Sequence, residues 1–403
     1  MKIKTSIVIL FLSLLPTILL SQRVNIRIFS DKQIKNVQLL PSFGKYLLVT
    51  NDKDTLFLQK NSRLDFKSKA KKIEASINDS VIGMFNKINF VSSGLKCFFQ
   101  INTTAKTADK NNITEQDLAE AEKNKIIRRY DGDLIILPNG EELMLINNVD
   151  ADSYIAAVVQ SETWGATTNV EFFKVQALCC RNYLYSNLQK HAKNGYNLCD
   201  NVHCQVYFSR ANKAEVIDGA YATKGEIVVD KEGNIIETLF HSNSGGQTVA
   251  AKDVWGKDIP YLVSVIDSFS LSSKHLNWEK TIRERQWLDY FRKKGLDVRD
   301  STIKEELLHF NQKDGRKTNI AGIPLVEVRK DFDLRSTFFD VSPWGTDVKL
   351  SGKGYGHGVG LSQEGAIQMS ENGYEYWEIL EHYFPSCTVI KKTETDKLFL
   401  PKN

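Results

Sequence analysis

The chain changes its hydrophobic periodicity near residue 150, and this change constrains the fold more than any other feature. Between Val24 and about Cys97, apolar and polar residues alternate in short runs such as VNIRIF, KYLLVT, DTLFLQ and KINFVSS. Alternation with a period of two predicts β-strands that bury one face. We therefore predict a small β-rich N-terminal domain over residues 23–105, followed by a polar linker over residues 106–124.

Helical periodicity begins after a predicted strand pair, GDLIILPNGEELMLIN, whose turn is Pro138-Asn139-Gly140. Asp150 and Asp152 can cap a helix, and one face of that helix combines an apolar stripe with a carboxylate: Ile155, Val158, Val159 and Glu162. A longer helix is predicted over about residues 169–189, before the chain returns to β runs. Helices and strands are therefore mixed in the second half of the chain, and the predicted fold class is α+β.

Residues 1–22 are predicted to form a secretory signal peptide, because two lysines precede an apolar run that ends near Ser21. An uncleaved N-terminal anchor is the alternative. Removal of the signal would leave an exported protein, in the periplasm or cell envelope, with no further membrane span. The net charge of +4, from 53 basic and 49 acidic residues, is too balanced for a dedicated nucleic-acid binder.

Glu162 is the single residue whose position points most directly to chemistry. Val158, Val159 and Trp164 are expected to desolvate its carboxyl group, and desolvation raises a carboxyl pKa. A carboxylic acid that stays protonated near neutral pH can donate a proton to a leaving group. A solvated glutamate at a helix end is the alternative, and the local pattern alone favours it.

Two cations follow on the next predicted helix. Lys174 and Arg181 are seven residues apart, so they share a face and lie about 10 Å apart along the helix axis. They could contact acidic or amide groups of a ligand, or they could form ion pairs within the protein.

The stretch HAKNGYNLCDNVHCQVY carries four side chains that can bind metal: His191, Cys199, His203 and Cys204. Thiol and imidazole ligands suit zinc, and a site rich in thiolates is structural more often than catalytic. A disulfide between Cys199 and Cys204 is an alternative outside the cytoplasm, and free thiols are a third. No cofactor is therefore expected to be required for activity, and any zinc would be structural.

The stretch SGKGYGHGVGLSQEGA, residues 351–366, places glycine at every second position from Gly352 to Gly360. It matches neither the Walker phosphate-binding pattern nor the dinucleotide fingerprint. Alternating glycines predict an extended segment that another backbone or a ligand approaches closely. A crowded structural corner is the alternative to a ligand site.

Several stretches, in this order, resemble signatures of the SpoIID/LytB domain of bacterial sporulation and cell-wall proteins: YIAAVVQSE, KVQALCCRNY, CDNVHCQVY, HSNSGGQT with VWG, PYLVSV, and GHGVGLSQEGA with GYEYWEILEHYFP. The resemblance covers about residues 125–392 and leaves a tail over 393–403. Two departures stand out. Thr163-Trp164 replaces a usual Met-Pro after the glutamate, and Glu364 replaces a common tyrosine.

The resemblance implies a peptidoglycan lytic transglycosylase that cleaves MurNAc-GlcNAc strands and leaves 1,6-anhydro-MurNAc ends, with Glu162 as general acid and base. Of the residues expected to bind substrate, His357, Ser362 and Gln363 are expected to offer hydrogen bonds. The full set of expected substrate-binding residues is Lys174, Arg181, Ser244, Gly245, Gly246, Trp255, His357, Ser362 and Gln363.

Two other functions compete with this one. A non-catalytic protein could bind glycan strands and stimulate or recruit a cell-wall amidase, since some relatives are described as amidase enhancers. A zinc amidase or peptidase could use His203, His241 or His357, but no H-E-x-x-H pattern supports it. The expected partners are peptidoglycan glycan strands and other cell-wall hydrolases.

Overall fold

The computed structural model describes residues 22–51, 54–59, 61–94, 96–104 and 125–392. The predicted signal peptide, except for Gln22, lies outside the described residues, as do the predicted linker and the C-terminal tail. Within the described ranges, no helix is long and apolar enough to cross a bilayer. The described part mixes strands and helices, which confirms the predicted α+β class and the strand-rich N-terminal region.

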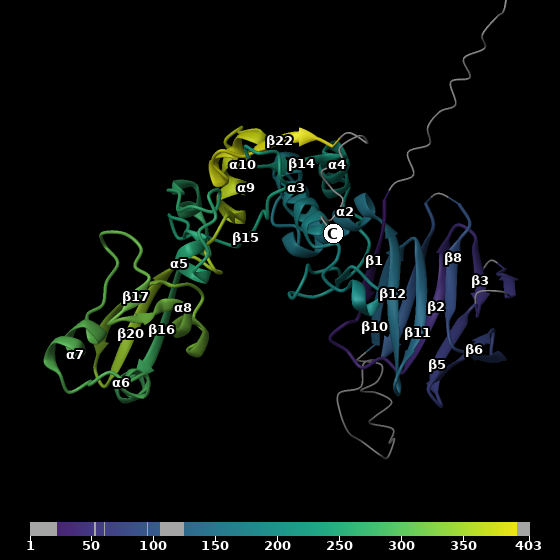
Figure 1. The fold of residues 1–403 in the computed structure, drawn as a ribbon, viewed down its shortest axis with the longest axis horizontal. Coiled ribbons are helices and arrows are strands. Elements are labelled where there is room, and N and C mark those ends of the chain that lie inside the picture. Colours follow the sequence, from purple (N-terminus) through teal and green to yellow (C-terminus); the bar gives the residue numbers. More distant parts are fainter. Residues whose placement is uncertain (1–21, 52–53, 60, 95, 105–124, 393–403) are drawn as a thin grey trace, which may run out of the picture.

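Two β-sheets build the N-terminal half (Figure 1). The first has the strand order β13 (Leu198–Cys199), β1 (Arg23–Ile28), β12 (Glu142–Asp150), β11 (Asp133–Asn139), β8 (Ile88–Ser92), β3 (Tyr46–Thr50) and β4 (Asp54–Phe57). The second has the order β10 (Lys125–Asp131), β9 (Phe98–Thr104), β2 (Asn36–Phe43), β5 (Leu64–Lys69), β6 (Lys72–Ile77) and β7 (Ser80–Phe85). Neighbouring strands are antiparallel except for β1 and β13.

Alternating side chains of the two sheets meet in a common core, as the period-two runs predict. In β1, for example, buried residues alternate with exposed or half-buried ones. The Phe99 ring on β9 lies 5.4 Å from the Phe90 ring on β8 and 6.0 Å from the Tyr46 ring on β3. These contacts join one sheet to the other, so the two sheets form a sandwich.

The sandwich extends beyond the predicted end of the N-terminal domain. Strands β10, β11 and β12, over Lys125–Asp150, are integral members of the two sheets. The predicted boundary at residue 125 therefore does not coincide with the edge of the sandwich. The turn predicted at Pro138-Asn139-Gly140 joins β11 to β12, so the predicted hairpin is present.

The helical part follows directly, and its first helix, α2 (Ala151–Thr163), starts where β12 ends. The Asp150 side chain accepts a hydrogen bond from the Ser153 N–H at 3.0 Å, so the predicted cap is present. Asp152 lies in the first turn instead. The other elements of this part are α3 (Val170–Ser186), η1 (Ala192–Asn194), α4 (Ala214–Ala222), β14 (Glu226–Val229), β15 (Phe240–His241), α5 (Ala251–Trp255), η2 (Ser268–Ser272), β21 (Leu361–Ser362), α9 (Gln363–Glu371), α10 (Tyr376–Tyr383) and β22 (Thr388–Lys391).

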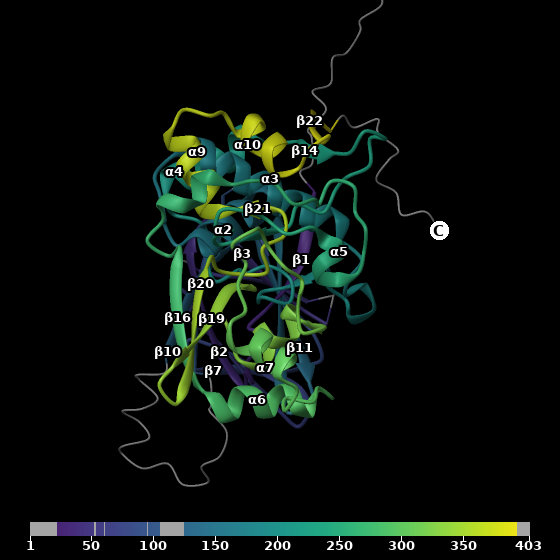
Figure 2. The same ribbon diagram turned by 90° about the vertical axis from the view of Figure 1, so that its left-hand side faces the viewer.

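A third part is inserted between η2 and β21 and has a hydrophobic core of its own, built around Trp287, Phe291 and Phe339. Its sheet has the order β16 (Asn277–Arg283), β20 (Asp347–Lys353) and β19 (Phe338–Trp344). Its other elements are α6 (Glu284–Lys293), α7 (Ser301–Leu308), β17 (Asn319–Ile320), β18 (Ile323–Pro324) and α8 (Leu325–Asp331). In Figures 1 and 2 the helices α3, α9 and α10 lie above both the sandwich and this inserted part.

Candidate functional site

Glu162 lies in the last turn of α2, where it is half-buried. Its Oε1 accepts a hydrogen bond from the Val206 N–H at 2.8 Å. Burial raises the pKa of Glu162 above its ordinary value, and the hydrogen bond from Val206 opposes this shift. The direction agrees with the sequence expectation, although Trp164 contributes little desolvation because its side chain points into solvent.

The segment 206–213 wraps around the end of α2 through a series of hydrogen bonds to consecutive side chains. Ser161 Oγ accepts from the Phe208 N–H at 3.2 Å, next to the bond between Glu162 and Val206. Gln160 Oε1 accepts from the N–H groups of Asn212 at 2.8 Å and Lys213 at 3.0 Å. The carboxyl group is therefore positioned by a neutral backbone donor, which leaves it able to hold a proton.

The raised pKa of Glu162 makes a prediction about stability. Below its ordinary pKa the carboxyl is protonated in the folded and unfolded states alike, so folding is not penalised. As the pH rises through the raised pKa of the folded protein, the buried group ionises and stability is lost. Glu162→Gln should therefore have a higher Tm than wild type at pH about 7 and a similar Tm at pH about 4. A Tm difference that does not change with pH would contradict this account of the carboxyl.

Lys174 and Arg181, both on α3, have different surroundings. Lys174 Nζ lies 2.5 Å from Glu171 Oε1 and 5.2 Å from the centre of the Tyr376 ring on α10. The Arg181 side chain is 0% exposed, so no glycan can reach it. The expectation that Arg181 binds substrate is therefore corrected: its guanidinium holds the end of α4 and the start of β14.

Backbone oxygens and one acidic side chain hold the Arg181 guanidinium in this position. Its Nη atoms donate to the carbonyl oxygens of Ala220 at 3.0 Å and Glu226 at 3.3 Å, and Nη2 lies 3.6 Å from Asp152 Oδ1. Burial lowers the pKa of Arg181, while Asp152 raises it. A cation with this set of partners is part of the core.

Removing the Arg181 charge should therefore destabilise the fold strongly. We expect Arg181→Met to lower the free energy of unfolding by about 3 kcal/mol, because it removes buried hydrogen bonds to two carbonyls and one of the two cations paired with Asp152. Lys174→Met on the same helix is the matched control, and loss of its partly exposed ion pair should cost about 1 kcal/mol or less. Urea denaturation measures both changes. Equal losses of unfolding free energy in the two variants would show that the buried contacts of Arg181 add no more stability than the exposed ion pair of Lys174.

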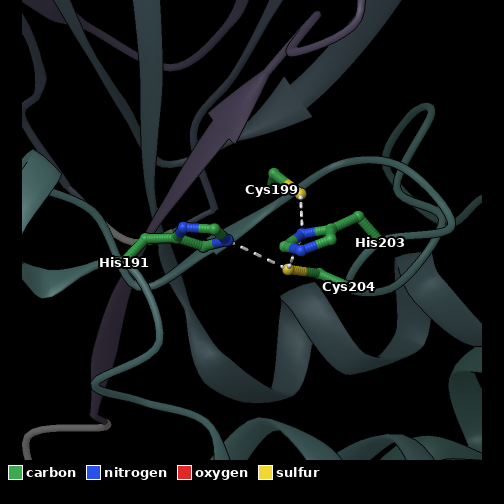
Figure 3. Close-up of side chains that lie close together, drawn as sticks. All are labelled: His191, Cys199, His203 and Cys204. Carbon is green, nitrogen blue, oxygen red and sulfur yellow. Dashed lines mark hydrogen bonds between the residues drawn. The ribbon is translucent and has the colours of Figure 1, made fainter.

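The four predicted metal ligands converge (Figure 3). One ligand atom from each of His191, Cys199, His203 and Cys204 lies within 4.8 Å of all the others. His203 Nδ1 is 3.6 Å from both sulfurs, and His191 Nε2 is 3.4 Å from Cys204 Sγ. Ligands at zinc-bond lengths around a tetrahedral centre are about 3.6 Å apart, so the spacing fits a zinc ion.

The chemistry of the donors also fits. Both cysteines are free thiols, so the disulfide alternative is not realised in the structure. A hydrogen bond with the Cys204 thiol, assisted by His203, lowers the pKa of Cys199 to about 4. A thiolate is the form of cysteine that binds zinc, and Cys199 supplies one. The stretch thus offers two imidazoles and two sulfurs in one place.

The loop that carries these ligands is tied to the sandwich. Strand β13 pairs with β1, and the Asp200 carboxylate accepts from the N–H groups of Phe29 at 2.6 Å and Ser30 at 3.0 Å. Val206 follows two residues after Cys204 in the same loop. The ligand cluster and the backbone donor to Glu162 therefore belong to one short, anchored segment.

The glycine stretch lies against protein backbone. A Cβ at Gly354 would lie 2.7 Å from the Asn243 oxygen, and one at Gly360 would lie 2.3 Å from the Leu239 oxygen. A Cβ at Gly356 would lie 2.7 Å from His241 Cβ. Gly354, Gly356 and Gly360 thus admit residues 239–245, so another backbone approaches this stretch closely, as in the crowded-corner alternative.

His357, at the middle of this stretch, uses both ring nitrogens on the backbone. Its Nε2 lies 3.0 Å from the Phe240 oxygen, and its Nδ1 accepts from the Val359 N–H at 3.1 Å. Burial lowers the pKa of His357 to about 4, so the ring is neutral. The expected hydrogen bond from His357 to a sugar is therefore corrected. The His357 ring also lies near the Trp255 ring, with 5.5 Å between the two centroids.

The serines and glycines of the expected binding set are structural as well. Ser244 and Ser362 are both buried; Ser362 Oγ caps α9, and Ser244 Oγ donates to Asp267 at 2.7 Å. Gly245 and Gly246 form a turn with positive φ values of 76° and 102°. Burial therefore corrects the expectation that either serine contacts substrate.

Trp255 and Gln363, like Lys174, keep accessible surface. Trp255, the last residue of α5, is an exposed aromatic, and Gln363 at the start of α9 is half-buried. Gln363 donates to Gln176 on α3 at 3.3 Å, and Gln176 contacts Cys180 at 3.7 Å. Gln363 is therefore held by α3, and burial raises the pKa of the Cys180 thiol well above its ordinary value, so that thiol is neutral.

Sequence reasoning missed the Val206 N–H that holds the carboxylate, because a backbone donor has no residue-type signature. It also missed the environment of Trp164, which was treated as part of the apolar surroundings of Glu162. The four ligand residues, in contrast, were recognisable because sulfur and imidazole side chains are rare and their clustering in sequence is informative.

Comparison with known proteins finds a family match and several curated relatives. The family described as stage II sporulation protein, SpoIID, matches residues 139–229, which include Glu162 and all four ligand residues. An uncharacterized protein of Brachyspira hyodysenteriae is 26% identical over 282 residues, covering 68% of this chain and 75% of that protein. Stage II sporulation protein D of Bacillus subtilis is 29% identical over 264 residues, covering 60% of this chain and 75% of that protein.

A further relative is the protein of Bacillus subtilis named amidase enhancer, 25% identical over 285 residues, which cover 56% of this chain and 38% of that protein. The match over residues 139–229 and the relatives named stage II sporulation protein D and amidase enhancer support the resemblance to the SpoIID/LytB family.

Proposed function

We propose that this protein is a peptidoglycan lytic transglycosylase that cleaves the glycan strand between MurNAc and GlcNAc. Its family indicates a function connected with the cell wall. The observation that carries the finer proposal is Glu162, a half-buried carboxyl whose pKa is raised by burial and whose partner is a neutral N–H group. Such a group can deliver a proton and take one back.

The proposed reaction needs one carboxyl group. Glu162 donates its proton to the glycosidic oxygen as the bond from that oxygen to C1 of MurNAc breaks. The carboxylate formed then accepts the proton of the C6 hydroxyl of the same MurNAc while that oxygen bonds to C1. The product is a 1,6-anhydro sugar, and Glu162 ends the cycle protonated. Ordinary glycosidases use a second carboxylate for the step that the C6 hydroxyl performs here.

We also propose that His191, Cys199, His203 and Cys204 hold a structural zinc ion. When bound, the ion would cross-link the ligand loop, as it does in closed sites built from thiolates. The residues of the loop then do the positioning: the Val206 N–H holds one oxygen of Glu162 and the Phe208 N–H holds Ser161. The reaction itself needs no cofactor in this proposal.

A second function is favoured by one specific observation, the similarity to the protein named amidase enhancer. In that case the chain would bind glycan strands and stimulate or recruit another cell-wall hydrolase without cutting strands itself. Under either function we propose that the protein is exported and acts on peptidoglycan in the periplasm or cell envelope.

One experiment separates the two functions. Purified glycan strands are incubated with wild type and with Glu162→Gln, and the released fragments are identified by mass spectrometry. The transglycosylase proposal predicts anhydro-ended fragments from wild type only. Intact strands with both proteins, together with equal stimulation of an added amidase by both, would instead identify an enhancer.

A further inference from the structure

An exposed tryptophan stands at the end of the helix that carries Glu162. Trp164 caps α2 with a left-handed backbone, φ 46°, and its side chain is 77% exposed. A left-handed conformation is uncommon for a bulky residue, and exposure of an indole leaves a large apolar face in water. The left-handed backbone ends α2, and the exposed indole face is free to contact a ligand.

A second aromatic ring accompanies it. The Phe208 ring lies 6.0 Å from the Trp164 ring between centroids, at an interplanar angle of 58°. Phe208 follows two residues after Val206, the donor to Glu162, just as Trp164 follows two residues after Glu162 itself. The two rings therefore come from the two segments that hold the carboxyl group.

Phe208 is fixed from its other side. The Arg128 guanidinium lies 4.8 Å from the centre of the Phe208 ring and 4.5 Å from that of Phe29, and it forms an ion pair with Asp200 at 3.2 Å. The Phe208 N–H is held by Ser161. Trp164 thus has a rigid aromatic neighbour, and the pair forms a preformed surface instead of two loose side chains.

A cation lies beside this surface. A Cβ at Gly165, which has φ 71°, would lie 2.0 Å from Lys213 Nζ, so the Lys213 ammonium occupies the space next to that glycine. The Lys213 N–H is bonded to Gln160 at 3.0 Å, which fixes the start of the side chain. Lys213 is exposed, so its charge is available to a ligand.

We propose that Trp164 and Phe208 form a binding subsite for one sugar ring beside Glu162, and that Lys213 recognises a carboxylate on that sugar. This rests on the proposed action on glycan strands. The apolar C–H face of a pyranose can pack on an indole, and the free lactyl group of MurNAc is a carboxylate that GlcNAc lacks. A lysine at the rim therefore distinguishes the two alternating sugars and sets the register of the strand.

The first test is binding of purified, peptide-free glycan strands, measured by calorimetry in the Glu162→Gln background so that no strand is cut. Trp164→Ala should raise the Kd about 10-fold or more, as loss of an exposed aromatic anchor does. Trp164→Phe should retain most of the affinity. Trp344→Ala on β19 is the matched control, because Trp344 is 62% exposed and belongs to the inserted part, and it should leave the Kd unchanged.

The second test isolates Lys213. Peptide-free strands are compared with the same strands after their lactyl carboxylates have been converted to methylamides. We expect the parent protein to prefer the carboxylate form about 5-fold or more, and Lys213→Gln to abolish that preference while binding the amide form normally. A merely structural role for Lys213 would weaken binding of both forms equally.

The outcomes separate this inference from the proposed function. Unchanged binding by Trp164→Ala, or a carboxylate preference that survives Lys213→Gln, overturns the subsite even if wild type cleaves strands. Conversely, a protein that binds as expected but never cleaves strands keeps the subsite and loses the transglycosylase proposal.

Discussion

Replacing Glu162 by glutamine should lower the rate of strand cleavage by roughly 100-fold to 10,000-fold, the range expected when a general acid and base is removed. Glutamine can still accept the hydrogen bond from the Val206 N–H that the carboxylate accepts now. It can neither donate a proton to the glycosidic oxygen nor accept one from the C6 hydroxyl. The fold and strand binding should therefore survive while turnover is lost. Rates from chromatography of released fragments measure the effect.

The pH dependence gives an internal control for this variant. Because burial raises the pKa of Glu162, wild-type activity should fall as the pH rises above that pKa and the proton to be donated is lost. Residual activity of Glu162→Gln should lack this decline. Wild-type rates in the glutamine variant, with the same pH profile, would mean that another group carries the proton.

Loss of one ligand in the loop should have the second large effect. We expect purified wild type to contain one zinc ion per chain, and Cys199→Ser to lose it together with most cleavage activity. Binding of structural zinc contributes roughly 10 kcal/mol to folding in small zinc domains, so Tm should also fall. The reason is local: without its cross-link, the loop from Cys199 to Lys213 no longer presents the Val206 N–H to Glu162.

Cys387→Ser is the matched control, since Cys387 is a free, half-buried cysteine outside the ligand cluster. It should keep the zinc, the Tm and the activity. Elemental analysis after extensive dialysis measures occupancy in all three proteins. Equal zinc content in wild type and Cys199→Ser would show that these residues do not form a zinc site.

The sequence was most informative where residue periodicity or a rare side chain carries the signal. Alternation between Val24 and Cys97 predicted strands, and the apolar stripe ending at Glu162 predicted α2 with its Asp150 cap, because burial repeats with the geometry of each element. The ordered motifs indicated the resemblance that the family match over residues 139–229 supports. The ligand loop was predictable because four sulfur and imidazole donors lie within a short stretch.

Burial of individual polar residues was much less predictable. Arg181, Ser244 and Ser362 look in sequence like residues that bind a ligand, but each is enclosed in the fold and satisfies backbone groups or buried acids. Periodicity places a residue on a face of a helix without saying what covers that face. Trp164 is the converse case, an aromatic that reads as core and stands in solvent.

The sequence also did not predict which strands, far apart along the chain, pair with one another. Strands β10, β11 and β12 pair with β9, β8 and β1, which all precede residues 106–124, and that polar stretch resembled a domain boundary. The core of the inserted part, around Trp287 and Phe291, likewise follows from contacts that no local pattern encodes. Local sequence patterns therefore predicted helices and strands, but not how the chain divides into domains.

The most direct test of the central claim is cleavage of purified glycan strands in water enriched in heavy oxygen, followed by mass spectrometry of the new ends. If the C6 hydroxyl of MurNAc closes on C1 with Glu162 as acid and base, the new ends are anhydro sugars, lighter by one water, and contain no heavy oxygen. Reducing ends that carry heavy oxygen would contradict the account, because they would show that water attacks C1 and that the protein is a hydrolase.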